Sequence, residues 1–462
     1  MDLKIIANFG QDVLNEADFM NAREVAFEVL LSVIKGEAYS NVALSKALND
    51  ADLSPQDAGL TAEIVYGTLN RYRLLQYKLT PHYQGRVKDW IKVLLAMALY
   101  QIVYLDRVPT YAAVDEATKM ATARGGEFNG KVVNAILRKL TETPIKDSIE
   151  MEKGANRLAI ETSHPTWLIR LWEAQFGMEK TEAMARRNRE RANLVLRTNL
   201  TKTTTAELKG KLQMEDVFCS LGHLYDDALI VMSGNPIHTN SFKEGLFYIQ
   251  DEASMMPALA LAPKAGAKVL DVCGAPGGKT LHLAQMVGDT GTVYAHDIYA
   301  HKIERIHENM NRMGITNVEA DVCSALKLHT KYEEESFDYV LVDAPCSGLG
   351  ILRRHPEARL TKQPEDLDTI TDIQKDILQQ ASKFVKPGGR LVYSTCTVNR
   401  KENQRQIETF LNENQNFSFD SEFKSRMPEA LAGNFEHEML QLFPQDFDTD
   451  GFFIAALVKK KS

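Results

Sequence analysis

Two cysteines of this chain stand in short motifs that directly follow apolar runs. Cys346 ends the tetrapeptide 343–346 (DAPC) after the apolar run 337–342, and Cys396 follows the apolar run 390–394. A single free cysteine is usually a small buried hydrophobic residue. Two cysteines at the ends of neighbouring strands, one of them three residues from the carboxylate of Asp343, instead favour nucleophilic catalysis by a thiol.

A thiol and a carboxylate at one site suit a reaction at C5 of a pyrimidine. C5 is a poor nucleophile, but a thiolate that adds to C6 makes it carbanion-like, so that it can attack an electrophilic methyl group. An acid near N3 stabilises the adduct, a base then takes the C5 proton, and a thiol pKa below about 8.5 helps the first step. Chemistry alone does not decide whether Cys346 or Cys396 is the nucleophile.

A glycine-rich turn follows the apolar run 268–272. Its glycines let the backbone approach a ligand, and the helix after it begins with free N–H groups. Asp297 ends the next expected strand, where an acid can accept both hydroxyls of a ribose. The turn lacks both the GxGxxG of NAD sites and the first glycine of a P-loop, so we expect a different nucleotide-type cofactor; the alternative is a tight turn for helix–strand packing. The turn consists of Cys273, Gly274, Ala275, Pro276, Gly277, Gly278 and Lys279.

The elements that must position these residues begin at about residue 266, where strand, turn and helix patterns alternate. This alternation predicts a mainly parallel sheet with helices on both faces. Ligands of such sheets bind beyond the carboxyl ends of the strands, and every residue named above falls at such an end. The expected strands are 268–272, 292–296, 337–342 and 390–394; the expected helices are 281–287, 301–313 and 365–385, the last closed by Pro387-Gly388-Gly389.

The first 150 residues have a different pattern. Apolar residues recur at spacings of three and four in 22–34, 58–69 and 91–104, which predicts helices. A polar stretch at 141–155 is typical of a linker, and short apolar pieces at 194–196 and 228–232 predict a small α/β unit. We therefore expect three domains, over residues 1–150, 151–250 and 251–462.

Composition excludes several classes of protein. The chain has 462 residues, 44% hydrophobic and 25% charged, which rules out a wholly disordered, collagen-like or coiled-coil protein. The longest apolar stretch, 91–105, is too short to span a membrane, and residues 1–12 do not look like a signal peptide. Five cysteines without a CxxC pair argue against a disulfide scaffold and a zinc site. We expect a cytoplasmic monomer without membrane or metal, whose net charge of −8 leaves room only for a local basic surface.

Several motifs resemble a known family. LDVCGAPGGKT, VDAPCSGLGILRR, PGGRLVYSTCT and TDGFFIAAL look like the RNA 5-methylcytosine methyltransferases of the Sun/RsmB/NOP group, which use S-adenosylmethionine. GLTAEIVYGTLNRYRLL, VPTYAAVDEATKMA and GKVVNAILRKL resemble the RNA-binding factor NusB. The resemblance covers about residues 20–460. It implies an all-α NusB-like domain, a small α/β linker region and a Rossmann-like seven-stranded methyltransferase domain.

The resemblance also implies a role for each motif residue. Residues 273–279 would cradle the methionine and ribose parts of S-adenosylmethionine, with Asp297 on the ribose hydroxyls and Asp321 beside the adenine. Asp343 would contact the substrate base and lie near the methyl donor. Within this group of RNA enzymes the thiol after the last strand, Cys396, would be the nucleophile.

Cys346 would then assist release of the product. Lys279 and the pair Arg353-Arg354 would contact phosphate or order the active-site loop. Three places depart from the family pattern. Gly274 stands where alanine is common, which should be harmless. Gln404 replaces the second acid of a usual Glu-Asn-Glu, and residues 193–197 lack the usual proline and aromatic residues. These departures put a role for the second acid, and RNA positioning by 193–197, in doubt.

The expected substrate is one cytosine of 16S ribosomal RNA, unpaired and flipped into the site. The alternatives are the same chemistry on transfer RNA or 23S ribosomal RNA, and a non-catalytic RNA-binding factor of ribosome assembly. The intact set of Asp343, Cys346 and Cys396 argues against the last. A basic track for RNA could comprise Arg71, Arg73, Lys131, Arg138, Lys139 and the arginines between 186 and 197.

Overall fold

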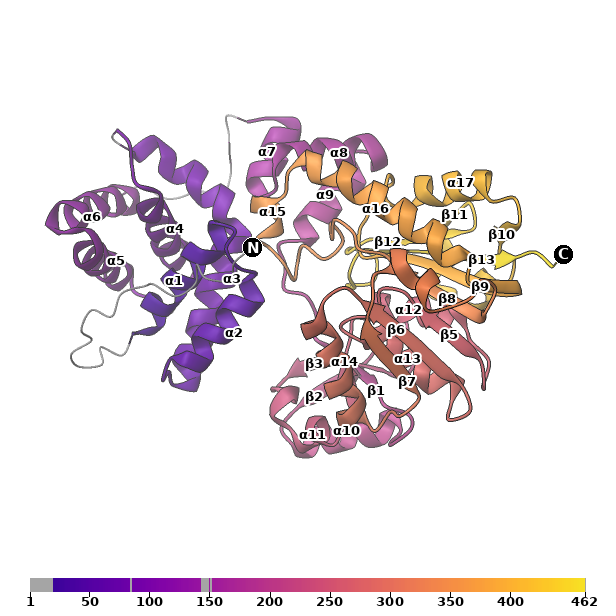
Figure 1. The fold of residues 1–462 in the computed structure, drawn as a ribbon. Coiled ribbons are helices and arrows are strands. Elements are labelled where there is room, and N and C mark those ends of the chain that lie inside the picture. The colour runs from indigo at the N-terminus through magenta and orange to yellow at the C-terminus, as the bar shows by residue number, and fades with distance from the viewer. Residues whose placement is uncertain (1–19, 84, 143–148, 150–151, 462) are drawn as a thin grey trace. The chain divides into compact units, whose positions relative to one another are not determined.

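The computed structural model describes residues 20–83, 85–142, 149 and 152–461. These residues form two compact units (Figure 1): one comprises the described residues up to Glu152 together with His355–Thr361, and the other comprises Lys153–Arg354 together with the described residues from Lys362 onward. Much of the expected linker 141–155 and all of the segment 1–12 lie outside the described residues.

The first unit is all-helical, as the sequence predicts. Its fourth helix, α4, is apolar nearly all round and lies buried at the centre of the unit, as such helices do. The third helix extends beyond the predicted 58–69 at both ends, because Ser54 caps it, Pro55 occupies its first turn and buried leucines continue its apolar stripe to Leu79. The helices are α1 (Ala22–Ile34), α2 (Ser40–Asp50), α3 (Pro55–Leu79), α4 (Asp89–Tyr104), α5 (Thr110–Gly125) and α6 (Glu127–Thr141).

A short segment from far along the chain completes this unit. Residues 355–361, which contain α15 (Ala358–Thr361), pack with the helices. Ser40 donates hydrogen bonds from its backbone N and its Oγ to the buried Glu357 carboxylate, at 3.2 and 2.7 Å, and Arg359 donates to Asn70. The chain thus leaves the second unit after Arg354 and returns to it at Lys362.

The second unit begins with three helices and a small antiparallel sheet of order β2-β3-β1-β4. The element order βαββαβ and this strand order are those of a ferredoxin-like fold, so the predicted small α/β unit is confirmed. The two predicted strands agree with β1 and β3. The elements are α7 (Gly154–Glu161), α8 (Thr166–Phe176), α9 (Met178–Arg187), β1 (Val195–Thr198), α10 (Thr205–Met214), β2 (Phe218–Leu221), β3 (Ala228–Ser233), α11 (Asn240–Lys243) and β4 (Phe247–Ile249).

A larger sheet follows, with nine strands among the described residues. Strands β7-β6-β5-β8-β9 are parallel neighbours, and β13 and β12 continue the sheet with antiparallel pairing. These seven strands confirm the expected Rossmann-like methyltransferase fold, to which β10 and β11 add short antiparallel pairings. The strands are β5 (Lys268–Asp271), β6 (Thr292–Asp297), β7 (Val318–Val322), β8 (Phe337–Asp343), β9 (Val385–Thr395), β10 (Phe417–Phe419), β11 (Phe435–Glu436), β12 (Met439–Leu442) and β13 (Phe452–Lys459).

Helices cover both faces of this sheet (Figure 1). Successive residues of a strand point to opposite faces, and Val269 and Leu270 of β5 accordingly belong to two different apolar clusters. The helices are α12 (Glu252–Leu261), α13 (Gly278–Val287), α14 (Ala300–Met313), α16 (Pro364–Ser382), α17 (Gln404–Glu413) and the short α18 (Phe423–Arg426). The cluster that contains Val269 packs against α12, α13 and α14, and the cluster that contains Leu270 packs against α16 and α17.

One predicted boundary is wrong. The helix expected over 365–385 ends at Ser382, and the residues 387–389 expected to close it lie inside β9. Val385 is fully buried and pairs with Phe337, so it belongs to the sheet. The next described pairing joins Tyr339 to Arg390, and the proline and glycines between form an irregularity in the strand, where Gly388 has a φ of +79°.

Candidate active site

The polar residues singled out in the sequence gather at the carboxyl ends of four strands. Asp271, Asp297 and Asp343 are the last residues of β5, β6 and β8, and β9 ends at Thr395. β5 lies between β6 and β8, so the chain turns to opposite sides of β5 at this point. That is the switch point at which open α/β sheets bind their ligands.

The two cysteines meet at this edge. β8 and β9 are parallel neighbours with Asp343 opposite Ser394, which confirms the predicted adjacency of the two strands. The Sγ atoms of Cys346 and Cys396 lie 3.2 Å apart, and both residues are half-buried. Hydrogen bonding to Cys396, burial and nearby negative charge raise the pKa of the Cys346 thiol well above its usual value. Cys346 therefore keeps its proton at neutral pH in this arrangement.

A lysine and a carboxylate stand beside the thiol pair. Lys279 Nζ lies 2.8 Å from Asp343 Oδ2, and Ser394 Oγ donates to Asp343 Oδ1 at 2.8 Å. Burial lowers the pKa of Lys279, but the charge of Asp343, its hydrogen bond and the charge of Cys396 outweigh burial, so the pKa is raised. Lys279 is thus a protonated cation beside the Asp343 carboxylate.

The glycine-rich turn is held tightly against the end of β5. Gly274 N donates to His296 O at 2.8 Å, and Thr280 Oγ1 bonds Asp271 Oδ2 at 2.7 Å and Gly274 O at 3.1 Å. A Cβ at position 274 would lie 2.8 Å from Thr280 Oγ1 and 3.1 Å from Asp271 Oδ2, so a side chain there would crowd this hydrogen bond. Asp271 Oδ1 is buried without a partner, and burial raises the pKa of Asp271 to about 7. The loop and α13, which follows it, expose backbone N–H groups at this edge.

The two acids expected around a nucleotide differ in their surroundings. Asp297 is half-buried at the end of β6, and its Oδ1 accepts a hydrogen bond from Tyr299 N at 3.1 Å. Asp321 is exposed on β7, where it forms an ion pair with Lys331 and lies beside His296, a ring whose pKa is lowered by burial. Both lie along the same edge as the glycine-rich turn, because β6 is the parallel neighbour of β5 and β7 is the parallel neighbour of β6.

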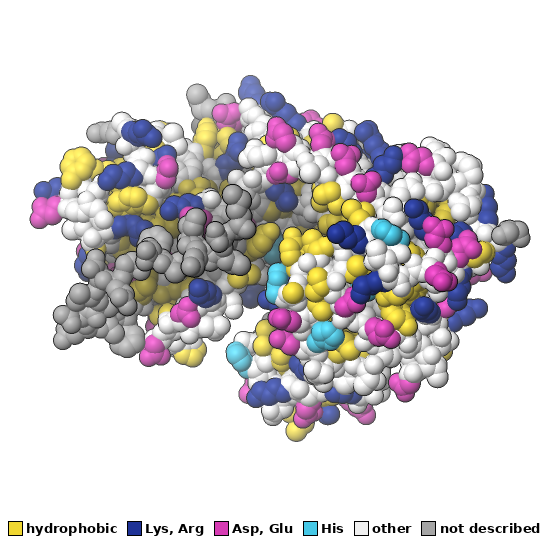
Figure 2. All heavy atoms as spheres, viewed as in Figure 1, with side chains coloured by type: hydrophobic (Ala, Val, Ile, Leu, Met, Phe, Trp, Pro, Cys, Tyr) yellow, Lys and Arg dark blue, Asp and Glu magenta, His cyan; other side chains and the backbone are white. Residues whose placement is uncertain are grey.

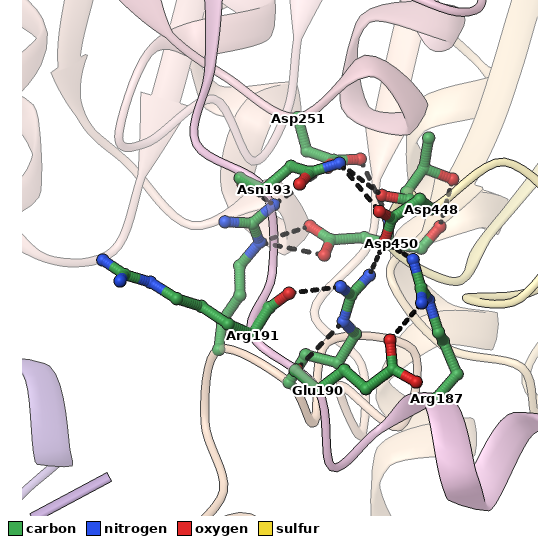
Figure 3. A network of polar contacts seen from close by, with 10 residues as sticks. Arg187, Glu190, Arg191, Asn193, Asp251, Asp448 and Asp450 are labelled. Carbon is green, nitrogen blue, oxygen red and sulfur yellow. Dashed lines mark hydrogen bonds and ion pairs between the residues drawn. The ribbon is translucent and has the colours of Figure 1, made fainter. Parts of the chain in front are cut away.

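Arg353 and Arg354 form internal ion pairs (Figure 3). Arg353 Nη1 lies 2.7 Å from Asp448, and its side chain is almost fully buried. Arg354 contacts Asp450 at 2.8 Å and Asp251 at 2.9 Å. Of the two roles expected for these arginines, phosphate contact or loop ordering, the geometry supports loop ordering.

The same network ties three parts of the second unit together. Arg353 and Arg354 follow the Pro-Cys motif, Asp251 caps α12, and Asp448 and Asp450 precede β13. Segment 187–193 joins through Arg187, which pairs with Asp448 and Glu190, and through backbone carbonyls that accept hydrogen bonds from the two arginines. The network therefore fixes the chain that leads away from Cys346.

The expected basic track is only partly available at the surface. Arg197 is 1% exposed; its Nη1 donates to Gln250 Oε1 at 2.7 Å and to Gly278 O at 2.8 Å, beneath the glycine-rich turn. It is therefore no surface residue, which corrects that part of the prediction. Arg186 pairs with Glu161 and Glu182. Figure 2 shows Lys and Arg side chains interspersed with Asp and Glu on the face in view.

A cleft of about 720 Å³ opens beside the network of Figure 3. Arg186, Arg187 and His223 line it together with Glu190, Asp446 and Asp448. Its charges are mixed and neither cysteine lines it, so it is distinct from the strand-end site.

Sequence reasoning missed several residues of this edge. Asp271 and Thr280 lie inside a motif that was recognised, but their support of the turn was not predicted. Glu402, the first acid of the altered Glu-Asn-Gln segment, is fully buried next to the cysteine loops. An acid six residues after Cys396, in a segment that resembles the family's Glu-Asn-Glu, is the sequence signal that could have identified it.

Comparisons with known proteins agree with this architecture. A family model described as 16S rRNA methyltransferase RsmB/F matches residues 258–458, and the NusB family model matches residues 20–142. A model of the RsmF/B-like ferredoxin-like domain matches residues 164–238. A Bacillus subtilis (strain 168) protein named probable ribosomal RNA small subunit methyltransferase B is 39% identical over 442 residues, which are 95% of this chain and 99% of that protein.

The chain belongs to the 16S rRNA methyltransferase RsmB/F family. A second RsmB-named relative, from Synechocystis, is 33% identical over 95% of this chain and 100% of its own length. The solved structure of PH0851 superposes with a TM-score of 0.81 at 26% identity, over 95% of this chain and 99% of that one. The RsmB/F catalytic model covers every strand end of the site described above.

The described residues contain neither a membrane-spanning helix nor a group of side chains that could bind a metal ion. Their helices include none that is long and apolar enough to cross a bilayer. Their His, Cys, Asp and Glu side chains form no group of three or more that could hold a metal ion.

Proposed function

We propose that this chain transfers a methyl group from S-adenosylmethionine to C5 of a cytosine in 16S ribosomal RNA. The observation that carries the proposal is the thiol pair, 3.2 Å apart, at the switch point of a methyltransferase sheet. Membership of the RsmB/F family supports the class of reaction and of substrate.

The residues at the edge of the sheet fit the methyl donor. The turn packs so closely against Thr280 that a Cβ at Gly274 would lie 2.8 Å from Thr280 Oγ1, and among the described residues Asp271 Oδ1 is a buried polar atom without a hydrogen-bond partner. Residues 273–279 would hold the methionine and ribose parts, Asp297 the ribose hydroxyls and Asp321 the adenine side. When bound, S-adenosylmethionine supplies an electrophilic methyl group on a sulfonium.

Cys396 is the proposed nucleophile. Its thiolate adds to C6 of the cytosine, which forms a C6–S bond and makes C5 nucleophilic towards the methyl group. Asp343 contacts the N3 edge of the base, and the Lys279 cation beside it stabilises negative charge that develops on the ring. A base then removes the C5 proton, the C6–S bond breaks, and Cys396 leaves as a thiolate. The net change replaces C5–H by C5–CH₃ and releases one proton.

The surroundings of the two thiols support this choice of nucleophile. Cys346 holds its proton because its pKa is raised well above the usual value by its hydrogen bond to Cys396, by burial and by nearby negative charge, which leaves Cys396 as the thiol for nucleophilic attack. Cys346 is proposed to assist release of the methylated product.

The test uses the donor, the RNA and the protein together. Purified protein is incubated with S-adenosylmethionine carrying a labelled methyl group and with 16S, 23S and transfer RNA in separate reactions, and the modified nucleotide is mapped. We expect label at C5 of a cytosine of 16S RNA. Label in transfer RNA or 23S RNA would overturn the substrate, and no label in any RNA under conditions where the donor binds would favour a non-catalytic assembly factor.

A further inference from the structure

Glu402 is a fully buried carboxylate that the proposed chemistry does not use. It lies just before α17, six residues after Cys396, and is 0% exposed. In the described part of the chain the partners of its carboxylate are neutral hydrogen-bond donors. Burying a carboxylate costs free energy unless hydrogen bonds satisfy it. The hydrogen bonds of Glu402 therefore indicate the role of this side chain.

One carboxylate oxygen holds the loop that carries Cys346. Oε1 accepts hydrogen bonds from Ser347 N at 2.8 Å and from Gln374 Nε2 at 3.0 Å. The same Gln374 Nε2 donates to Pro345 O at 2.9 Å. The residues on both sides of Cys346 are thus fixed, one directly by Glu402 and the other through Gln374 of α16.

The other oxygen connects that loop to the one that carries Cys396. Oε2 accepts from Ser347 Oγ at 2.6 Å, Asn399 Nδ2 at 3.0 Å and Thr397 Oγ1 at 3.5 Å. Ser347 Oγ and Thr397 Oγ1 also lie 2.8 Å from each other. Ser347 follows Cys346 and Thr397 follows Cys396, so one carboxylate spans the two residues that come directly after the thiols.

We propose that Glu402 is a positioning residue that locks the two cysteine loops at one separation, so that both thiols address the same base. This inference rests on the proposed function, because it assigns Glu402 a part in the steps at Cys396 and Cys346. Glu402 does not touch the substrate. Its negative charge also contributes, after the hydrogen bond to Cys396 and burial, to the raised pKa of the Cys346 thiol.

The chemistry of the contacts identifies an informative substitution. Glu402→Gln keeps the size of the side chain but replaces one acceptor oxygen by an NH₂ group, which would face donors from Ser347 or Asn399. One loop must then move. Displacement of a reacting group by about 1 Å can cost about 100-fold in rate, so we expect this loss in the step that needs both loops. Binding of the methyl donor should not change, because the carboxylate contacts of Glu402 are with Ser347, Gln374, Thr397 and Asn399, outside residues 273–279.

The experiment measures the rate of covalent adduct formation. In a Cys346→Ala protein, product release is blocked, and the adduct between Cys396 and 16S RNA should accumulate and be visible as a shifted band in a denaturing gel. We expect Cys346→Ala/Glu402→Gln to form this adduct about 100-fold more slowly, with an unchanged dissociation constant for S-adenosylmethionine. Ser347→Ala, which removes one of the five contacts, should slow the adduct about 10-fold in the same background, in proportion to a smaller displacement.

The matched control is Asp420→Asn in the same Cys346→Ala background. Asp420 is also a buried carboxylate, but it pairs with Arg390 and Arg426 at the end of β10, away from both cysteine loops. It should lose thermal stability without slowing the adduct.

The outcomes separate the two proposals. An adduct that forms in Cys346→Ala at an unchanged rate with Glu402→Gln overturns the role of Glu402 and leaves the proposed function standing. Slowing by Asp420→Asn as large as that by Glu402→Gln would reduce the effect to general destabilisation and also overturns it. If Glu402→Gln does not fold, Ser347→Ala decides by the same readout. No adduct in Cys346→Ala itself would overturn both the proposed function and this inference.

Discussion

Gly350→Ala adds one methyl group and should disrupt the strand-end site that contains Cys396. Gly350 lies four residues after Cys346, at a point where three segments of backbone cross. Its N donates to Cys396 O at 3.0 Å, and its O accepts from Gly451 N at 2.8 Å. A Cβ added at Gly350 would lie 2.0 Å from Gly451 O and 2.7 Å from Cys396 O.

The size of the effect follows from these distances. Both obstacles are backbone atoms, so no side chain can turn away, and a separation near 3 Å requires a shift of about 1 Å in one of the segments. Such overpacking typically costs 1–3 kcal/mol of stability, to which the two strained hydrogen bonds add about 1 kcal/mol each. Because Cys396 lies in one of the segments, we expect its thiol to be displaced and the methylation rate to fall by about 100-fold or more.

The assay is single-turnover transfer of a labelled methyl group to 16S RNA, together with thermal unfolding. The control is Gly210→Ala in α10, where an added Cβ meets nothing within 4 Å; alanine there should leave the rate unchanged and stabilise the helix by about 0.5–1 kcal/mol. A Gly350→Ala protein whose rate of methyl transfer is within about twofold of that of the unaltered chain would refute the expected displacement of the Cys396 thiol.

Three further predictions concern buried charges of the second unit. Lys279→Met leaves Asp343 without its cation and should lower the free energy of unfolding by about 3 kcal/mol and the methylation rate by at least about 10-fold; equal values for both proteins in urea unfolding and methyl transfer would contradict this. Arg354→Met strands two buried carboxylates, Asp251 and Asp450, and should cost about 3–5 kcal/mol by the same unfolding assay, whereas a loss under about 1 kcal/mol would mean that the network is dispensable. The pKa of Asp271 is about 7 in the folded chain and lower in the unfolded chain. Its contribution to the free energy of unfolding is therefore present at low pH and is lost as the pH rises through 7. The unaltered chain should therefore lose up to about 4 kcal/mol relative to Asp271→Asn between pH 4 and 8, and parallel stability curves would exclude a raised pKa.

The convergence of the thiols could be predicted because it depends on topology alone. A strand, turn and helix pattern implies parallel strands whose carboxyl ends share one edge, and Cys346 and Cys396 both follow such strands. Nothing about side-chain orientation was needed. The same logic placed the glycine-rich turn and Asp297 correctly along that edge.

Features that depend on long-range packing could not be predicted in this way. Glu402 collects donors from positions 347, 374, 397 and 399, and no local pattern says that these segments meet. The sequence suggests that Arg197 is one of several surface arginines. However, β1 is an inner strand of the small sheet, and the Arg197 side chain is buried beneath the glycine-rich turn. The motif 387–389 looks like a helix stop, and only its pairing partner, β8, shows that it belongs to a strand.

The proposal that Cys396 is the nucleophile is tested most directly by identifying the protein atom that bonds to RNA. Cys346→Ala protein is incubated with S-adenosylmethionine and 16S RNA, the adduct is digested with protease and nuclease, and the nucleotide-linked peptide is sequenced by mass spectrometry. We expect a 5-methyl-5,6-dihydrocytosine joined through C6 to the sulfur of Cys396. A nucleotide on any other residue, or methylation that persists undiminished in Cys396→Ala, would contradict it.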